Sequence, residues 1–256
     1  MFIKNNSNIL FFFLTFLFLS SICSAQKNEY SQSIQIHKEN IIKLPAPYRD
    51  GKVSLEKVLS KRRSIREYSG DSLSISEISQ ILWAAQGITK KIEDPPSSWR
   101  GKQWKWMGGR RTAPSAGALY PIELYIAVGR VKGLSQGLYK YNPQEHTIIK
   151  VLEGDKRVDI SNAALKQSCI LKGAVNIIIF GVYKRTAFKY GKRAEQYMQI
   201  ECGAVCQNIY LQSYALDLGT VFVGAFKDDS LKFTLNIPED EYPLGIMPIG
   251  KIIQTK

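Results

Sequence analysis

Residues 174–183 read A-V-N-I-I-I-F-G-V-Y and form a nearly continuous apolar run. Such a run is typical of a central strand that is covered on both faces, because a strand with one wet face would alternate. Residues 193–216 follow with helical spacing and with more apolar content than a surface helix carries. We therefore expect a buried strand, followed by a long helix that runs through the core or through a subunit interface.

The flanking sequence predicts further helices and strands. A capping box at residues 74–77 starts an apolar helical stripe that Gly87 ends. Strict alternation predicts a strand over 122–128, and a hairpin joins 138–141 to 147–152. The remaining expectations are a polar arm at 26–50, a helix from Ser54 with Leu55, Val58 and Leu59 on one face, a loop at 90–111, a strand and turn at 219–226, a short helix at 228–235 and a last strand at 244–253.

The order of these elements predicts one α+β domain. Helices and strands come in runs without a clean βαβ alternation, and no G-x-G-x-x-G follows a strand. Both observations argue against a Rossmann fold. The length of 256 residues and the hydrophobic content of 45% allow one substantial core or two modest ones.

The charge balance is strongly basic. Lys and Arg number 35 against 22 Asp and Glu, which gives a formal net charge of +13. Such an excess is compatible with nucleic acid, with an anionic surface or with phosphate ligands, and charge alone does not choose among them. The 22% charged and 11% aromatic residues exclude a disordered chain.

The first 25 residues have the pattern of a secretory signal peptide. Lys4 precedes the apolar run 9–19, and small residues follow up to Ala25, after which we expect cleavage. The run is shorter than the ~20 residues that a membrane-spanning helix needs. We expect an exported protein, periplasmic or extracellular, with a signal peptide at 1–25, an N-terminal arm at 26–53 and a domain at 54–256. A lipid anchor at Cys23 is the less favoured alternative.

Cysteine and histidine are scarce after the leader. Cys202 and Cys206 lie four residues apart in an apolar helical stretch, where disulfide geometry is poor, so we expect these residues and Cys169 to be buried thiols. With His37 and His146 as the only histidines, we expect no metal site and no Ser-His-Asp or Cys-His hydrolase. His146 follows a turn-like Asn-Pro sequence, which favours a solvated turn residue.

Three segments carry residues suited to ligand chemistry. Residues 61–66, K-R-R-S-I-R, supply guanidinium groups and a hydroxyl that can surround a phosphate, although a solvated basic patch is the alternative. Residues 111–121, R-T-A-P-S-A-G-A-L-Y-P, place small residues where backbone can approach a flat ligand, or form an ordinary tight loop. Residues 221–226, V-F-V-G-A-F, form a strand that ends in small residues.

In this order and spacing, the three segments resemble the nitroreductase superfamily of FMN-dependent oxidoreductases, and most closely its SagB/ThcOx branch of thiazoline/oxazoline dehydrogenases. The resemblance extends over about residues 55–252. Three more motifs carry it: W-A-A-Q-G-I-T at 83–89, K-Y-G-x-R at 189–193 and E-x-G-x-x-x-Q-N at 201–208, followed by P-L-G-I-M-P-I-G-K near the end. It implies an α+β, nitroreductase-like fold with a mixed sheet, flanking helices and a long central helix, and active sites at a homodimer interface.

The resemblance also implies roles for individual residues. The family's FMN phosphate and ribityl segment matches Arg62, Arg63, Ser64 and Arg66, and its loop along the isoalloxazine matches Pro114, Ser115, Ala116 and Gly117. The backbone that faces the flavin edge matches Val223 and Gly224, and Lys251 lies near the family's terminal phosphate-binding cation.

Lys189 and Tyr190 match the pair that the azoline-oxidising branch uses in proton removal. A lysine at its reference pKa of ~10.4 is a poor base at neutral pH, so such a site would have to desolvate it or place it beside other cations. Arg185, Lys192 and Arg193 are nearby in the sequence. Without the resemblance, residues 184–193 would be interpreted as a solvated cationic loop that leads into the long helix.

Three functions follow as hypotheses. The first is an exported, homodimeric FMN oxidoreductase that takes a hydride from a small-molecule or peptide-borne heterocycle. The second is an NAD(P)H-dependent nitro or quinone reductase. The third is an exported, non-catalytic binding protein that uses the Trp-rich, cationic loop at 99–106. That loop could also act as a lid or pack against the core. We do not expect nucleic acid as a partner, because no second basic-aromatic segment is present.

Overall fold

A computed structural model describes residues 40–92 and 108–253. The predicted signal peptide, Cys23, His37 and the Trp-rich loop at 99–106 lie outside the described residues. Within those ranges, no helix is long and apolar enough to span a membrane.

A seven-stranded sheet forms the centre of the described chain, in the order β1-β6-β5-β4-β7-β9-β8. Its central strand β7 (Val175–Val182) is buried at all eight positions, as the opening apolar run predicts. β7 pairs with β4 (Ile122–Val128) on one edge and with β9 (Glu241–Lys251) on the other. The remaining strands are β1 (Ile41–Lys43), β5 (Gly137–Asn142), β6 (Thr147–Glu153) and β8 (Leu218–Thr220).

The ladders between these described strands are antiparallel. A parallel bridge between Ser64 and Thr220 attaches the segment after residue 61 to the sheet at its β8 edge. The expected hairpin is present, because β5 and β6 pair across the turn at 143–146.

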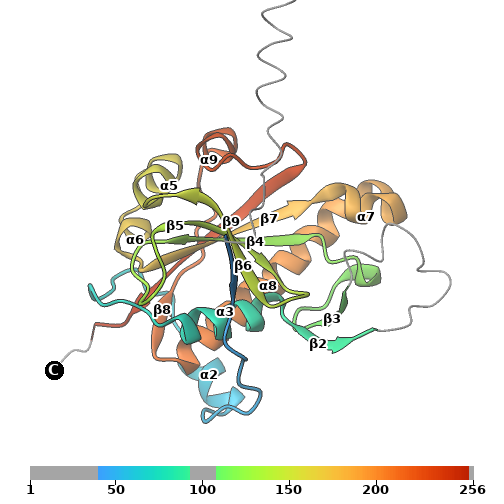
Figure 1. Cartoon of the computed structure of the whole chain (residues 1–256). Helices are drawn as coiled ribbons and strands as arrows, with labels where there is room; N and C mark the ends of the chain where they lie inside the picture. The colour runs from blue at the N-terminus through green and yellow to red at the C-terminus, as the bar shows by residue number, and fades with distance from the viewer. Residues whose placement is uncertain (1–39, 93–107, 254–256) are drawn as a thin grey trace, which may run out of the picture. The chain divides into compact units, whose positions relative to one another are not determined.

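Helices cover both faces of the sheet (Figure 1). On one face, α3 (Ile75–Gln86) and α8 (Ala194–Ala215) pack together and against the sheet, and α2 (Leu55–Lys61) packs on α8. On the other face lie α5 (Arg157–Ala163), α6 (Ser168–Lys172) and α9 (Asp228–Thr234). α8 is the expected long helix, and eight of its side chains are buried. The α+β fold with a sheet between helices is therefore confirmed.

Local sequence signals account for two of the helix starts. Ser74 and Glu77 form the predicted capping box, and Gly87 is the C-cap of α3. Ser54 caps α2 by accepting a hydrogen bond from the Lys57 amide. On α2, however, only Val58 of the predicted apolar face is buried, whereas Leu55 and Leu59 are 57% and 52% exposed.

Other expectations were wrong in detail. Part of the predicted polar arm forms β1, and the predicted loop at 90–111 begins and ends in a two-stranded ribbon, β2 (Ile88–Lys91) with β3 (Gly109–Arg111). The alternative of a solvated cationic loop at 184–193 is wrong about the loop, because that stretch forms helix α7 (Tyr183–Tyr190) and the short helix η4 (Gly191–Arg193) against α8. Its lysines are exposed, as that alternative expected.

The expectation for His146 was also wrong, because its side chain is partly buried and hydrogen-bonded and not solvated. Its Nε2 lies 2.7 Å from Ser79 Oγ and its Nδ1 lies 2.9 Å from Tyr141 Oη. Nε2 also lies 3.1 Å from the Pro45 carbonyl oxygen. Burial is the main reason why the pKa of His146 is lowered. The three cysteines of the described chain are buried free thiols, as expected.

Candidate active site

The basic segment at 62–66 follows α2 directly. The Arg62 guanidinium is half-buried and lies 5.0 Å above the centre of the Tyr210 ring. Arg63 donates from one guanidinium nitrogen to the carbonyl oxygens of Ser60 and Arg62, which leaves its other N–H groups for a ligand. Ser64 and Arg66 are exposed. The segment thus presents two guanidinium groups and a hydroxyl to the surface.

Tyr210 on α8 connects this segment to residues 221–224, which follow β8 and are not the strand that the sequence predicts. Its Oη lies 3.1 Å from Ser64 Oγ and accepts a 2.7 Å hydrogen bond from the Phe222 amide. Val223 is held by two backbone hydrogen bonds to Ile246, of 2.8 and 2.9 Å. The predicted phosphate segment and the predicted flavin-edge residues, Val223 and Gly224, therefore lie in one group around Tyr210.

Lys251 pairs with a carboxylate in the described chain, whereas its expected role is to bind a phosphate. Its ammonium is hydrogen-bonded to Glu77, the capping-box residue of α3. Burial alone would raise the pKa of the Glu77 carboxyl, but the bonds from Lys251 and Ser74 outweigh it and lower that pKa. In the described chain, the Lys251 charge is compensated by this carboxylate, so its role as a phosphate-binding cation stays a prediction.

The loop at 114–117 belongs to a strained turn that includes η3 (Ala116–Ala118). Gly117, Ala118 and Tyr120 have φ angles of 62°, 53° and 46°, in the left-handed region that side chains disfavour. The Ser115 hydroxyl accepts a 2.8 Å hydrogen bond from the Tyr120 amide, which closes the turn. Strain of this kind is often found where a ligand needs close access to backbone.

The predicted catalytic pair lies against this loop. A β-carbon placed on Gly117 would lie 2.8 Å from Tyr190 Oη and 3.0 Å from Lys189 Nζ. The Lys189 ammonium is 5.3 Å from the centre of the Tyr190 ring, which packs edge-on against Tyr197 at 4.9 Å. Residues that are more than 70 positions apart in the sequence therefore meet at Gly117.

A buried carboxyl, Glu201 of α8, supports the same loop from beneath. Glu201 is 2% exposed, accepts a 3.1 Å hydrogen bond from Gln86 Nε2 and accepts another from the Ser115 hydroxyl. Gln86 in turn accepts from Arg111 at 3.0 Å. Burial raises the pKa of Glu201 to about 7, against the opposing effect of these partners. The sequence assigned no role to Glu201, although it is part of the E-x-G-x-x-x-Q-N motif.

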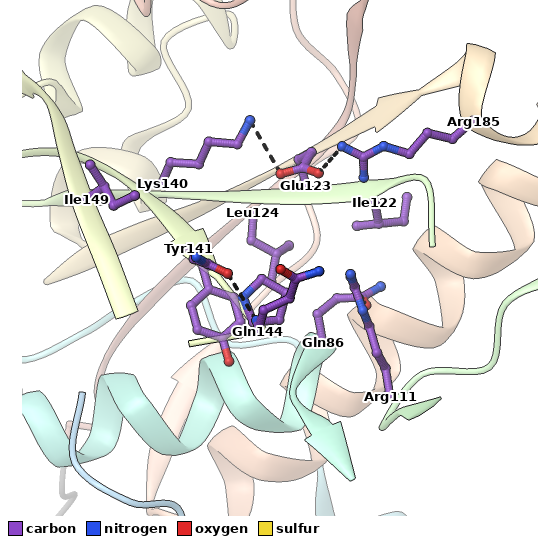
Figure 2. A pocket seen from close by; sticks show the side chains of 12 residues that line it. Gln86, Arg111, Ile122, Glu123, Leu124, Lys140, Tyr141, Gln144, Ile149 and Arg185 are labelled. Carbon is purple, nitrogen blue, oxygen red and sulfur yellow. Dashed lines mark hydrogen bonds and ion pairs between the residues drawn. The ribbon is translucent and has the colours of Figure 1, made fainter. Parts of the chain in front are cut away.

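A cavity of about 240 Å³ lies next to this network, between the start of β4 and the end of β5. Figure 2 shows Lys140 and Arg185 pointing at Glu123 from opposite sides. Burial would raise the pKa of Glu123, but these two cations outweigh it and lower that pKa. The lining residues include Gln86, Arg111, Tyr141 and Gln144, so the cavity is polar and carries charges of both signs.

The predicted site residues thus form two groups along α8. The Ser64 group, residues 62–66 and 221–224, contacts Tyr210. The Gly117 group, residues 114–117 with Lys189 and Tyr190, contacts Glu201. These two helix positions are nine residues apart. Nine residues correspond to a rise of about 14 Å and to opposite faces of the helix. In Figure 1, α2 and β8 lie toward one end of α8, and α7 lies toward the other.

The residues of the two groups fit the two ends of FMN. The exposed Arg63, Ser64 and Arg66 side chains match the donor set that a phosphate monoester requires. Gly117 has no side chain at a point where one would collide with the Tyr190 hydroxyl, so Lys189 and Tyr190 can lie directly against the backbone of this loop. An apolar cavity of about 280 Å³ lies between Phe222 and α8, beside the segment at 221–224.

The model of the nitroreductase family matches residues 59–251. The chain belongs to the nitroreductase family. This membership makes oxidoreductase chemistry its class of reaction.

Individual relatives agree with the assignment. The chain is 42% identical over 202 residues to a protein of Methanocaldococcus jannaschii whose name places it among the nitroreductases, with 79% of this chain and 93% of that protein covered. A nitroreductase-like structure from Ralstonia eutropha JMP134 superimposes with a TM-score of 0.70 at 26% identity, covering 84% of this chain and 91% of that one. The trifolitoxin operon protein TfxC of Rhizobium leguminosarum bv. trifolii is 23% identical over 207 residues, which are 75% of this chain and 54% of TfxC.

Proposed function

We propose that this nitroreductase-family protein is an FMN-dependent oxidoreductase of the SagB/ThcOx type, acting on a small-molecule or peptide-borne heterocycle. Bound FMN would supply the hydride acceptor at N5. The observation that carries the proposal is the contact of Gly117 with Lys189 and Tyr190, because it joins the loop that matches the isoalloxazine site to the pair that matches the proton-removing site.

The geometry around Gly117 suits proton transfer beside a flat ring. The Lys189 ammonium and the Tyr190 hydroxyl converge on one glycine, and Lys189 is exposed on the described surface, where a substrate can reach it. Oxidation of an azoline ring releases a hydride and a proton, so it needs a group that accepts the proton. A lysine does so only in its uncharged amine form, which a ring bound over it would favour by excluding water. Lys189 and Tyr190 are our assignment for that step. The similarity to TfxC, a trifolitoxin operon protein, favours a substrate in toxin production.

The two groups along α8 support a homodimer. A second copy would bring the Gly117 group of one chain to the Ser64 group of the other. Apolar side chains are exposed on the helices between the groups: Leu55 and Leu59 on α2, and Ile200 on α8, which is 62% exposed. We expect Ile200→Asp to give a monomer in sedimentation and to lose FMN, and a monomeric wild-type protein that retains FMN would disprove this arrangement.

Flavin binding tests the proposal first. The purified protein should be yellow and contain FMN, and Arg62→Ala with Arg66→Ala should weaken that binding. A colourless protein that refuses added FMN would favour the alternative of an exported, non-catalytic binding protein.

Substrate oxidation tests the catalytic assignment. An azoline should bleach the flavin without oxygen, and Lys189→Ala should abolish this bleaching while FMN binding is retained. Turnover of the variant at the wild-type rate would contradict the role of Lys189.

A reductase is the second candidate, and the name of the 42% identical M. jannaschii protein favours it. In that case, NAD(P)H would bleach the flavin and a nitro or quinone compound would restore its colour. Bleaching by an azoline and not by NAD(P)H separates the first candidate from the second.

We further propose that the protein is exported. The leader pattern at 1–25 is the support for this proposal. N-terminal sequencing of protein from the periplasm or medium should begin at Gln26. An unprocessed Met1 in the cytoplasmic fraction would contradict it.

A further inference from the structure

The Tyr210 hydroxyl makes two contacts, and the direction of one of them is fixed by the donor. The Phe222 amide can only donate, so Tyr210 Oη accepts the 2.7 Å bond between them. The phenol has one hydrogen of its own, and Ser64 Oγ lies 3.1 Å from Oη. That hydrogen is available for donation to Ser64 Oγ, and this pair of hydroxyls lies at the exposed surface beside the basic segment.

We propose that Tyr210 is a positioning residue for phosphate binding: it donates to Ser64 Oγ and so directs the Ser64 hydroxyl hydrogen outward, toward the phosphate of FMN. This inference rests on the proposed function, because the ligand is the phosphate end of that cofactor. Once Ser64 Oγ accepts from Tyr210, its own hydrogen is available to an anion, which is the direction that a phosphate oxygen requires.

Arg62 holds the tyrosine in this orientation. Its guanidinium lies 5.0 Å above the ring centre, where a cation is attracted to the ring face. Arg62 therefore contributes to the site through Tyr210, while Arg63 and Arg66, on the exposed surface, supply the charges that face the ligand.

The two segments that Tyr210 joins have backbone anchors of their own. The Ile65 amide donates to the Thr220 carbonyl at 2.8 Å, and Val223 and Ile246 exchange two hydrogen bonds. Removal of the Tyr210 hydroxyl should therefore leave the fold and both segments in place. What it removes is the constraint on the direction of the Ser64 hydroxyl.

The test compares FMN with riboflavin, which has the same ring but no phosphate. In the full-length protein, Tyr210→Phe should raise the dissociation constant of FMN about tenfold, a typical effect of one hydrogen bond to a charged group. The dissociation constant of riboflavin should change less than about twofold, since the ring contacts are intact. Tyr214→Phe, one turn further along α8, is the matched control and should leave both constants unchanged.

A double variant gives the second readout. Ser64→Ala should weaken FMN binding at least as much as Tyr210→Phe, and the combination should weaken it no further than Ser64→Ala does, because Tyr210 acts through the Ser64 hydroxyl. Equal weakening of FMN and riboflavin, unchanged FMN binding by Tyr210→Phe, or additive losses in the double variant would each overturn the inference alone. A wild-type protein that binds neither flavin overturns the proposed function and this inference with it.

Discussion

The Arg185 guanidinium lies 2.5 Å from the Glu123 carboxylate, at the point where α7 approaches the start of β4. Its other terminal nitrogen donates to the Tyr120 carbonyl at 3.0 Å. One side chain therefore ties the helix that carries Lys189 and Tyr190 to the turn that carries Gly117. Since Lys140 also faces Glu123 at 3.3 Å, this carboxylate compensates two cations.

Glu123→Gln should destabilise the protein by about 3 kcal/mol, because it leaves two largely buried cations with less countercharge. Urea unfolding measures this loss. Glu153→Gln is the control: Glu153 pairs with Lys150, but its side chain is 78% exposed, so its loss should stay below about 1 kcal/mol. Equal losses of unfolding free energy in the two variants would show that the buried Glu123 ion pairs stabilise the protein no more than the exposed Glu153 pair does.

Gly117→Ala should lower the turnover rate strongly and the free energy of unfolding only modestly. A β-carbon at this position would push away the Tyr190 hydroxyl and the Lys189 ammonium, which are flexible ends that can move. The left-handed backbone adds a cost of about 1 kcal/mol. Gly133→Ala has the same kind of strain, at φ +76°, but no atom within 4 Å of the new β-carbon. Both variants should lose similar stability, and only Gly117→Ala should lose turnover.

The raised pKa of Glu201 predicts that the free energy of unfolding falls as the pH rises. Its folded-state pKa of about 7 lies above the ordinary 4.5, so the folded protein holds this proton more tightly than the unfolded chain does. The stabilisation is complete below the unfolded pKa and disappears as the pH rises through 7. The free energy of unfolding of wild type minus that of Glu201→Gln should fall by about 3 kcal/mol from pH 4.5 to about pH 8. A difference that does not vary with pH would contradict the raised pKa.

The lowered pKa of His146 predicts the opposite trend, a stability that falls as the pH falls. Its folded-state pKa is lowered from 6.5 mainly by burial, so its contribution is present above that pH and is lost as the pH falls through the folded-state value. The melting temperature of wild type should therefore fall relative to that of His146→Gln on acidification from neutral pH. Parallel curves for the two proteins would show that His146 does not titrate on unfolding.

The sequence predicted the elements whose own side chains carry the signal. β7 and β4 are long apolar or alternating runs, and the capping box starts α3 where expected. β1 and β3 have only three residues each and are missed, since so short a segment has no period to detect. α7 is mostly polar and packs on α8, so tertiary contacts and not its own pattern indicate the helix.

The candidate site divides in the same way. Motif spacing found Ser64, Gly117 and Lys189, which lie in segments with unusual local composition. It gave no role to Tyr210 and Glu201, because each is one of several polar side chains in a long helix of mixed composition and nothing in the local pattern distinguishes it. Their roles depend on partners that only the fold brings near: Phe222 and Ser64 for the tyrosine, and Gln86 and Ser115 for the carboxyl.

The position of β7 has a consequence for how the molecule opens. Its eight residues are buried and it is paired along both edges, so its amides can exchange with deuterium only when the sheet itself comes apart. Labelling of residues 175–182 therefore reports the global unfolding of the domain. α2, with most of its side chains in solvent, can fray on its own and reports local motion at the candidate phosphate end. One labelling experiment can thus separate a variant that loosens this end from one that weakens the whole domain.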